Sequence, residues 1–581
     1  MFKKVFSLLN YSEKKNFVFL FLLILFTGFV DTLGVASILP FITVLSNVEI
    51  IETHNFLSKI YELSKILGVN STKQFLTFMG LCTFFVIVIS LITRALSQFF
   101  QTRFSYMCEY NLSKRLINNY LSQPYIWFLN KNPSHLIKNI LSEVQQLVGS
   151  TITPFINLLS NLIIILLLLT LIFFFDPIVS TFIILILGVC YVSIFYFVKK
   201  ILYNIGLERV QANQERFTMI SEAIGAIKEV KLLGLEQIFV DRFKNPAKIY
   251  AAKQTTAALI SLLPRYFIEG IAFGGMIMLI LFLISHNASE TILKVIPIIS
   301  LYAFVGYRII PSFQQIYISL AQLRYSSSAL NLIHKDLIQL KLINLKNIKN
   351  KLTFKKFIKL NNVSFSYTDI KGASLKNINL TIPVLSKVGI IGPTGSGKST
   401  LVDIILGLIE PSSGNMTVDD IVISENNKIS WQKNIGYVPQ QIYLSDASIM
   451  SNIAFGQDIN SIDYHKVECA AKLANIHEFV INELNGGYET VVGDRGIRLS
   501  GGQRQRIGIA RALYNQPQVL IFDEATNALD ELTEKTILEN IRNLKYKSTL
   551  IIITHRQSTV NDCDTIFLLE QGKLIVQKNY N

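Results

Sequence analysis

The sequence contains few charged residues for its length. Only 16% of its 581 residues are Asp, Glu, Lys or Arg, whereas 50% are hydrophobic. Soluble proteins carry about a quarter charged residues, so this composition excludes a wholly soluble protein and indicates contact with lipid. The 55 Lys and Arg outnumber the 40 Asp and Glu. Beside long apolar runs, such an excess marks one side of a membrane, and we expect no nucleic-acid partner.

Cysteines are scarce as well. The five cysteines show no CxxC spacing, and no histidine cluster lies near them. This pattern favours neither a zinc site nor a disulfide framework. The N-terminal stretch lacks a short apolar core followed by a small-residue cleavage site. We therefore expect no removable signal peptide, and the first long apolar run should direct the chain to the membrane.

Six apolar runs are long enough to cross a bilayer, which takes about 20 residues. Basic residues concentrate near the N-terminus and in the loops at about 101–150 and 199–255. By the positive-inside bias these segments are cytoplasmic. The loop at about 53–68 has apolar residues on one helical face, which predicts an amphipathic external helix, either a cap on the spans or a lipid-surface helix. The six runs are Phe17–Leu45, Phe75–Phe99, Ile152–Phe175, Ile178–Val198, Thr256–Ser285 and Ile292–Leu320.

The character of the chain changes after the sixth run. We predict an α-helical six-span transmembrane domain over residues 1–330 and a linker over 331–354. From residue 355 to 581, short β-branched runs alternate with helical stretches. This alternation is typical of an α/β domain with a parallel sheet.

A phosphate-binding loop is the strongest local signal in this second domain. The segment GPTGSGKST fits GxxxxGK[ST] and directly follows an apolar strand. Its backbone amides and the start of the next helix suit phosphate oxygens, with Lys398 on the β and γ phosphates of ATP and Ser399 on Mg²⁺. A coincidental glycine-rich turn is the alternative, which the strand–loop–helix context disfavours. The residues are Gly392, Pro393, Thr394, Gly395, Ser396, Gly397, Lys398, Ser399 and Thr400.

Two carboxylates end a buried strand in VLIFDE, residues 519–524. In a domain with a phosphate loop, Asp523 is interpreted as a Mg²⁺ partner and Glu524 as the base that polarises the attacking water. A helix cap or a surface pair is the alternative for both. Between the two motifs lies LSGGQ, with Ser500, Gly501, Gly502 and Gln503.

This combination resembles the ATP-binding cassette transporters, whose signature motif is LSGGQ. The resemblance implies an exporter-type half-transporter, an ATPase that works as a homodimer with two nucleotides sandwiched head to tail. It also assigns Tyr367 to adenine stacking, Gln440 to Mg²⁺ and water, Asp530 to the dimer-crossing loop and His555 to the γ-phosphate. A core aromatic and a structural histidine are the alternatives for Tyr367 and His555. Asn527 and Asp494 depart from the commoner serine and glutamate of the family.

The same resemblance implies coupling helices in the two long cytoplasmic loops, with candidates at 123–144 and 222–234. A channel or regulatory protein whose cassette only binds ATP is the alternative class. The presence of Lys398, Gln440, Glu524 and His555 disfavours it, because these residues form a complete hydrolytic set.

Three arginines lie within predicted spans: Arg94, Arg265 and Arg308. Charges at that depth normally pair with another group or face a cavity. Arg265 could pair with Glu269 one turn away, and Asp31 on another span could reach Arg308. Guanidinium groups also suit a pyrophosphate.

The patterns around these arginines resemble the lipid-linked oligosaccharide flippases of bacterial N-glycosylation. That resemblance implies a polyprenyl-pyrophosphate glycan as substrate, the three arginines as contacts to its head group, and the bacterial inner membrane as the location. Exporters of other lipids such as lipid A, of peptides and of drugs share the architecture and remain alternatives.

Overall fold

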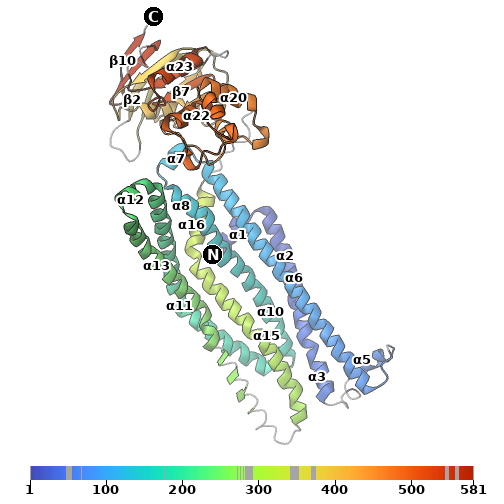
Figure 1. Ribbon diagram of the computed structural model, residues 1–581. Helices are drawn as coiled ribbons and strands as arrows, with labels where there is room; N and C mark the ends of the chain where they lie inside the picture. Colours follow the sequence, from blue (N-terminus) through green and yellow to red (C-terminus); the bar gives the residue numbers. More distant parts are fainter. Residues whose placement is uncertain are drawn as a thin grey trace. The chain divides into compact units, whose positions relative to one another are not determined.

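The computed structural model divides the chain into two compact units. The first unit comprises Met1–Gln123 and Asn130–Ile343, and the second comprises Pro124–Leu129 and Asn344–Asn581. Figure 1 shows a helical first unit and a second unit that contains both sheets. The described residues are 2–46, 51, 55–66, 68–175, 177–267, 269–270, 273–274, 277–278, 281, 292–340, 352–367, 374–543, 548–556, 560 and 562–579.

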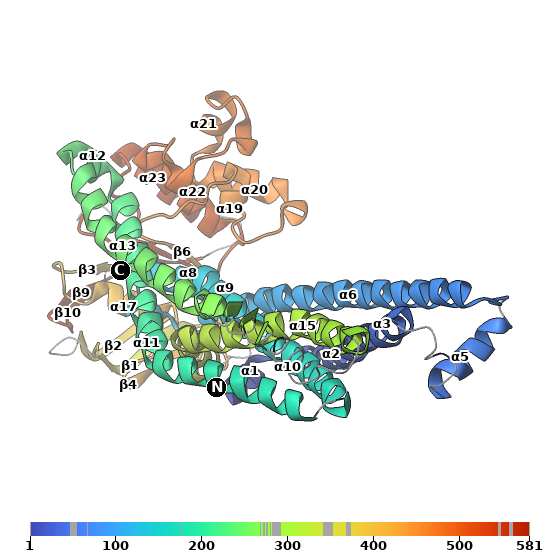
Figure 2. The ribbon, with the colours of Figure 1, turned by 90° about the horizontal axis from the view of Figure 1, so that it is seen from below.

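Long helices that run side by side form the first unit (Figures 1 and 2). They are joined by short segments, of which η1 and η2 are π-helical. The elements are α1 (Phe2–Leu8), α2 (Tyr11–Ala36), α3 (Ile38–Ser46), α5 (Asn55–Lys65), α6 (Thr72–Leu121), α8 (Pro133–Lys138), η1 (Asn139–Glu143), α9 (Val144–Leu147), η2 (Val148–Ile152), α10 (Thr153–Phe175), α11 (Pro177–Gly225), α12 (Ile227–Leu233), α13 (Glu236–Leu262), α15 (Ile292–Tyr325) and α16 (Ser327–Gln339).

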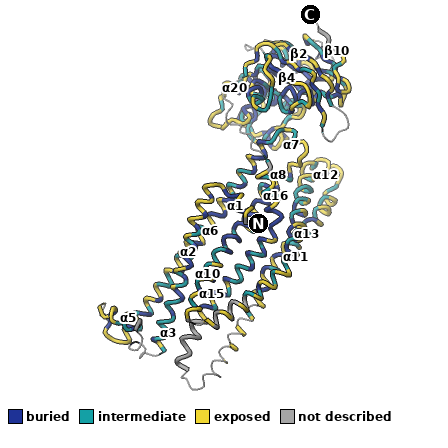
Figure 3. The backbone as a smooth tube through the Cα atoms, turned by 180° about the vertical axis from the view of Figure 1, so that it is seen from behind, coloured by how far each residue is buried: buried dark blue, intermediate teal, exposed yellow. Residues whose placement is uncertain are grey.

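Among the described residues, four helical segments are long and apolar enough to cross a membrane: Tyr11–Ser46, Thr72–Leu121, Pro133–Phe174 and Gly188–Gly225. They contain the first four predicted runs or most of each. The sixth run falls within α15, while much of the fifth lies outside the described residues. No more than 39% of the most apolar window of each segment is buried. Exposed residues accordingly line the outer faces of the helices in Figure 3, where lipid or another subunit would cover them.

Local sequence explains how several of these helices begin and meet. Ser71 caps α6, because its side chain accepts from the amide of Gln74 while the Gln74 side chain returns to the backbone of Ser71. Gly206 allows α11 to approach the end of α15, since a Cβ atom there would lie 2.0 Å from the carbonyl oxygen of Tyr325. Helix α5 packs on the spans through buried Leu57, as a cap would, and leaves Leu63 exposed.

The second unit contains two sheets. A four-stranded antiparallel sheet has the order β2-β1-β4-β5, and a six-stranded sheet has the order β10-β9-β3-β8-β7-β6, parallel except for β10. The predicted α/β domain with a parallel sheet is confirmed. The strands are β1 (Phe357–Phe365), β2 (Leu375–Pro383), β3 (Lys387–Ile391), β4 (Ser413–Val418), β5 (Ile421–Val422), β6 (Ile435–Val438), β7 (Val519–Asp523), β8 (Thr549–Ile553), β9 (Thr565–Glu570) and β10 (Lys573–Asn579).

Helices pack around the six-stranded sheet to complete this unit. Strands β3, β7 and β8 consist largely of Val, Ile and Leu that are almost fully buried, as expected for parallel strands covered on both faces. The helices are α17 (Lys398–Ile405), α18 (Lys428–Gln432), α19 (Ile449–Ile453), α20 (Tyr464–Leu473), α21 (His477–Asn482), α22 (Gly501–Leu513) and α23 (Glu531–Arg542), with short 3₁₀ turns η4 (Ile459–Ser461), η5 (Gly487–Glu489) and η6 (Asp494–Gly496).

One helix of the second unit comes from far away in the sequence. Helix α7 (Tyr125–Leu129) belongs by its contacts to the cassette unit, although it lies within the first loop that the sequence predicts to be cytoplasmic. Ile126 packs against the apolar cluster that also holds Tyr367 and Tyr437. The predicted coupling segment 123–144 therefore contains a helix that docks on the second unit.

Candidate functional site

The predicted ATP-site residues lie at one edge of the six-stranded sheet. Strands β3, β8, β7 and β6 are neighbours and run parallel. Their carboxyl ends therefore meet at the same edge. The segments that follow them carry the phosphate loop after β3, His555 after β8, Glu524 after β7 and Gln440 after β6. Motifs more than 150 residues apart are thus brought together by strand order.

The phosphate loop needs glycine where it turns into helix α17. Gly397 has a φ of +106°, and a Cβ atom there would lie 2.6 Å from the carbonyl oxygen of Ser374. A side chain is excluded by both conformation and space. The amides of the loop and of the first turn of α17 can then face an anion, as at the N-termini of other phosphate-binding helices.

Lys398 lies against the phosphate loop that precedes it. Its Nζ donates to the carbonyl oxygens of Gly392 at 2.8 Å and Pro393 at 2.9 Å. Burial lowers the pKa of the Lys398 ammonium, while Glu524 and Asp523 oppose that shift. The hydroxyl Oγ of Ser396 is buried within the same loop without a hydrogen-bond partner. A phosphate group fits this arrangement, because it would satisfy the ammonium, the free hydroxyl and the amides together.

Glu524 is the best-connected carboxylate at the sheet edge. Its Oε1 lies 2.6 Å from Nε2 of His555, and its Oε2 accepts from Nε2 of Gln440 at 2.7 Å. Asn527 donates to the same Oε2 at 3.3 Å. These contacts join the residues predicted to be the base, the γ-phosphate sensor and the water-binding glutamine. An anchored carboxylate of this kind can hold a water molecule and accept its proton.

The backbone at Glu524 is strained. Its φ is +49°, in the left-handed region that side chains other than Asn and Asp seldom adopt. The amide of Glu524 donates to the carbonyl oxygen of Ile553 at 2.9 Å, so strand β8 fixes the turn. Such strain is held by surrounding structure and concentrates at functional sites. Sequence analysis did not predict this turn or the contact between Asn527 and Glu524. It noted Asn527 only because serine is commoner at this position in the family.

Asp523 has a different environment. The Oη of Tyr437, at the end of β6, donates to Oδ2 of Asp523 at 3.2 Å. Burial raises the pKa of the Asp523 carboxyl, and neighbouring Glu524 adds to that rise, whereas the bond from Tyr437 and the charge of Lys398 lower it. Sequence analysis missed Tyr437. The available signal was its place three residues before Gln440, on a strand paired with β7.

The donor set suits Mg²⁺ bound together with ATP. In nucleotide sites this ion takes one or two protein oxygens and obtains its remaining ligands from phosphates and water. The exposed hydroxyl of Ser399, the Asp523 carboxylate and the Gln440 amide supply oxygens of that kind. Among the described residues there is no group of three His, Cys, Asp or Glu that could hold a metal by itself.

The signature motif forms the start of helix α22. Ser500 caps this helix, accepting from the amide of Gln503 at 3.2 Å, while the Gln503 side chain returns to the amide of Ser500 at 2.8 Å. Gly501 is exposed, and a Cβ atom at Gly502 would lie 3.2 Å from the carbonyl oxygen of Ala528. The signature residues thus offer backbone amides and a hydroxyl at a helix N-terminus, where an anion is favoured.

Two further predicted residues have defined neighbours. Asp530 caps helix α23, where its Oδ2 accepts from the amide of Thr533 at 2.9 Å. Tyr367 is half-buried, with its ring edge against Phe365 and its hydroxyl 3.4 Å from Oγ1 of Thr400 in the phosphate-loop helix. The ring therefore lies next to the phosphate loop, where an adenine-stacking aromatic is expected.

Comparison with known families decides which protein class carries this site. The family of the ABC transporter transmembrane region matches residues 17–309, and the ABC transporter family matches residues 375–527. This chain is an ABC transporter. It combines one membrane domain with one ATP-binding cassette, so it is an exporter half-transporter, a multi-pass membrane protein and an ATP-driven translocase.

Several known proteins are similar to this half-transporter. The alpha-hemolysin translocation ATP-binding protein HlyB of Escherichia coli is 30% identical over 507 residues, covering 85% of this chain and 68% of that protein. The heterocyst differentiation ATP-binding protein HepA of Nostoc is 31% identical over 505 residues, covering 85% and 81%. A solved bacterial Atm1-family ABC exporter with ATP bound shares the fold, with a TM-score of 0.79 at 22% identity, covering 98% of this chain and 96% of that one.

The three arginines of this half-transporter differ in their surroundings. Arg265 is 49% exposed and pairs with Glu269 on the same helix, at 2.7 Å between Nε and Oε1. Arg308 is 16% exposed, and its NH1 lies 3.4 Å from Oδ1 of Asp31, which confirms that Asp31 reaches it from another span. Arg94 is half-buried. The two ion pairs balance the charges of Arg265 and Arg308, as the structural alternative of the sequence analysis required.

Proposed function

We propose that two copies of this chain form an exporter that uses Mg²⁺ and ATP to flip a lipid-linked oligosaccharide, a polyprenyl-pyrophosphate glycan, across the bacterial inner membrane. The cassettes and the N-terminus face the cytoplasm. In each cassette Lys398 and the phosphate-loop amides hold the nucleotide, Ser399, Asp523 and Gln440 serve the metal ion, and Glu524 accepts the proton of the attacking water while His555 orients it. Mg²⁺, when bound, neutralises charge on the phosphates.

The signature motif supports the proposed dimer. The signature residues Ser500, Gly501 and Gly502 lie at the N-terminus of α22, where Ser500 and Gln503 form a capping box and Gly501 is exposed. A second copy placed head to tail would aim this N-terminus at the nucleotide on the phosphate loop of the first. Exposed apolar residues at the tip of α12, Leu232 at 81% and Leu233 at 64%, would dock on the partner copy.

The charged groups within the spans carry the substrate proposal. Asp31 is 2% exposed, accepts from the Ser90 hydroxyl at 2.7 Å and leaves its Oδ2 without a hydrogen-bond partner. With Arg308 at 3.4 Å, three spans meet at one charged centre. A pyrophosphate carries more negative charge than one carboxylate and would compete for the guanidinium groups of Arg308 and Arg265. Half-buried Arg94 would add a third cation.

Transport by arginine and aspartate variants in vesicles tests this substrate. We expect Arg308→Ala to lower ATP-dependent flipping of a polyprenyl-pyrophosphate glycan by at least about tenfold, because one charge-assisted contact is worth about 1.5–3 kcal/mol. Asp31→Asn frees Arg308 for the head group, so flipping should persist or rise. If both single variants fail equally and Asp31→Asn combined with Arg308→Met restores transport, the pair is structural and the head-group role is wrong.

A polypeptide substrate is the second candidate. It is supported by the relatives, since the alpha-hemolysin and leukotoxin translocation proteins are 29–30% identical over 507–510 residues. The same vesicles separate the two candidates. Transport of a reporter polypeptide without movement of the glycolipid would favour the second candidate, and the reverse result would favour the first.

A further inference from the structure

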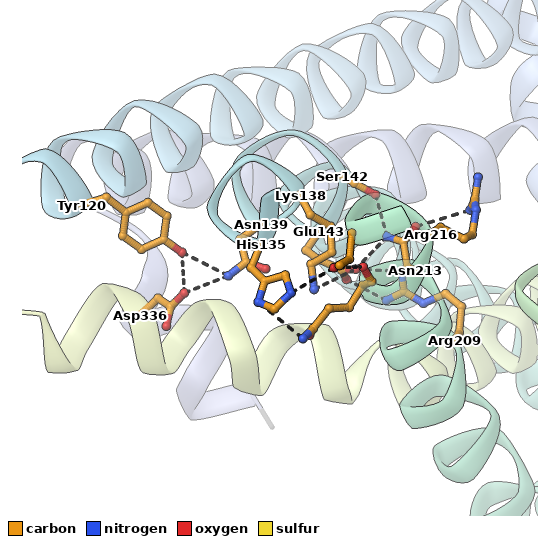
Figure 4. A network of polar contacts seen from close by, with 12 residues as sticks. Tyr120, His135, Lys138, Asn139, Ser142, Glu143, Arg209, Asn213, Arg216 and Asp336 are labelled. Carbon is orange, nitrogen blue, oxygen red and sulfur yellow. Dashed lines mark hydrogen bonds and ion pairs between the residues drawn. The ribbon is translucent and has the colours of Figure 1, made fainter. Parts of the chain in front are cut away.

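A buried polar cluster in the helical unit takes no part in ATP chemistry. At its centre lies Glu143, which is fully buried. Its Oε2 accepts from NH2 of Arg209 at 2.8 Å, and its Oε1 accepts from Nδ2 of Asn213 at 3.0 Å. The ammonium of Lys138, also fully buried, lies 4.0 Å from Oε1 (Figure 4). The cluster thereby joins α8 and η1 to helix α11.

The cluster continues to a second carboxylate. Asp336 of α16 accepts through Oδ2 from the hydroxyl of Tyr120 and from Nδ2 of Asn139, the latter at 3.1 Å. Asn139 also donates to Oη of Tyr120 at 3.2 Å. Because Asn139 follows Lys138 directly, the two carboxylates are linked through one short segment of chain. Figure 4 shows these side chains converging, and they come from α6, α8, η1, α11 and α16.

The segment that carries Asn139 and Glu143 is π-helical. Segment η1 spans Asn139–Glu143, and a second π-helical segment, η2, spans Val148–Ile152. Thr151 of η2 lies 2.6 Å from the hydroxyl of Ser326, at the junction of α15 and α16. π-Helical turns are rare, and they occur frequently at functional sites. Here they place polar side chains toward α11 and α16.

The members of the cluster lie beside the points where the chain passes between the two units. Tyr120 precedes α7, the helix docked on the cassette, by a few residues, and Lys138 follows it. Asp336 lies in the last described helix before the cassette. One cluster thus contacts the end of α6 before α7, the segment α8–η1 after it, and α16, which precedes the cassette in sequence. Through Glu143 it connects these segments to α11.

Stability alone explains this cluster poorly. The free energy lost by removing the two ions from water is about as large as the free energy gained from their attraction. Apolar residues of the same volume therefore usually stabilise a fold as well or better. What an ion pair with fork geometry adds is a fixed mutual position of the elements that it joins.

We propose that the Lys138–Glu143–Arg209 cluster transmits movement of the cassettes to the membrane helices by holding α8, η1, α11 and α16 as one rigid body. These are positioning residues, since none touches ATP. The proposal rests on the homodimer of the proposed function, because the movement is that of two cassettes closing on ATP. Without the cluster, the two cassettes should still close on ATP and hydrolyse it, but the membrane helices should no longer move when the cassettes close.

Paired spin-label distances in the full homodimer test this role. One label replaces exposed Asn70, just before α6, and another replaces exposed Asp458 in the cassette, each in a background without native cysteines. In the otherwise unaltered protein, ATP, Mg²⁺ and orthovanadate should change both inter-subunit distances. In Glu143→Gln the cassette change should persist, while the Asn70 change falls below about a third of its normal size.

A second variant guards against misfolding. Lys138→Met, Glu143→Leu and Arg209→Met together replace the ions by apolar groups of similar volume, and Asn213 keeps its bond to the Ser142 hydroxyl at 3.0 Å. In this triple variant we again expect the Asp458 distance to change normally and the Asn70 distance to change little. Glu236→Gln, which breaks the exposed Lys231–Glu236 pair, is the matched control and should change nothing. Normal changes at both label pairs in the cluster variants, or loss of both, would overturn the proposal. An unaltered protein with no inter-subunit distance at all would instead reject the homodimer.

Discussion

Replacing Glu524 with glutamine is expected to lower kcat for ATP hydrolysis by roughly a hundred- to ten-thousandfold, the range that general-base catalysis contributes. Glutamine matches the size of Glu524 and can still bond to Gln440 and Asn527, but it cannot accept a proton from water. ATP should therefore bind with nearly unchanged affinity. Steady-state phosphate release and equilibrium binding of labelled ATP measure the two quantities separately.

A matched control for this variant lies a few residues away. Glu531 is an exposed glutamate at the start of α23, and Glu531→Gln should hydrolyse ATP at the normal rate. If Glu524→Gln retained more than about a tenth of the activity, the proton would have another acceptor. The role given to Glu524 and its contact with His555 would then need revision.

Replacing Lys398 with methionine should produce the second-largest effect, this time on binding. The ammonium bonds to two loop carbonyls. In the proposed function it is the positive charge that the phosphate loop offers to ATP. Its loss should weaken ATP affinity by at least about tenfold, given about 1.5–3 kcal/mol for a charge-assisted contact, and hydrolysis should fall to background. Isothermal titration with the full-length protein measures the affinity.

Lys535→Met provides the comparison for Lys398→Met. Lys535 is an exposed lysine on α23. Its replacement removes the same charge from the same domain without touching the phosphate loop, so ATP affinity should stay unchanged. Equal losses of affinity in the two variants would show that net charge, and not the contact of Lys398 with phosphate, governs binding.

Much of the ATP site could be predicted because its motifs report local structure. One buried strand is followed by the glycines of the phosphate loop and Lys398, and another ends in Asp523 and Glu524. Each motif places its side chains at the end of a strand. Parallel pairing then brings these ends to one edge without further information. The apolar runs in the first 200 residues were predictable for a similar reason, since bilayer thickness sets the length of a span and the run of apolar residues is read directly from the sequence.

Contacts between side chains far apart in sequence could not be predicted in this way. Tyr437 reaches Asp523 from 86 residues away, and Arg209 reaches Glu143 from 66 residues away. No periodicity encodes such pairs, because each depends on how two finished helices or strands pack. The π-helical segment at Asn139–Glu143 is similar, since its sequence has no signal that separates it from an α-helix. The Arg308–Asp31 pair could be predicted, because apolar spans contain few charged residues and each of them needs a partner.

A mixture of two inactive variants tests most directly whether each ATP site is shared between two copies of the chain. Lys398→Met disables the phosphate loop and Ser500→Arg blocks the signature N-terminus, so each homodimer should hydrolyse ATP only at background. In the mixed dimer, one site combines the intact phosphate loop of one copy with the intact signature of the other. The account predicts that differently tagged, co-purified mixed dimers recover up to about half of the normal ATPase rate, since one of two sites is restored. Mixed dimers that remain at background, or a Ser500→Arg homodimer that hydrolyses ATP normally, would contradict it.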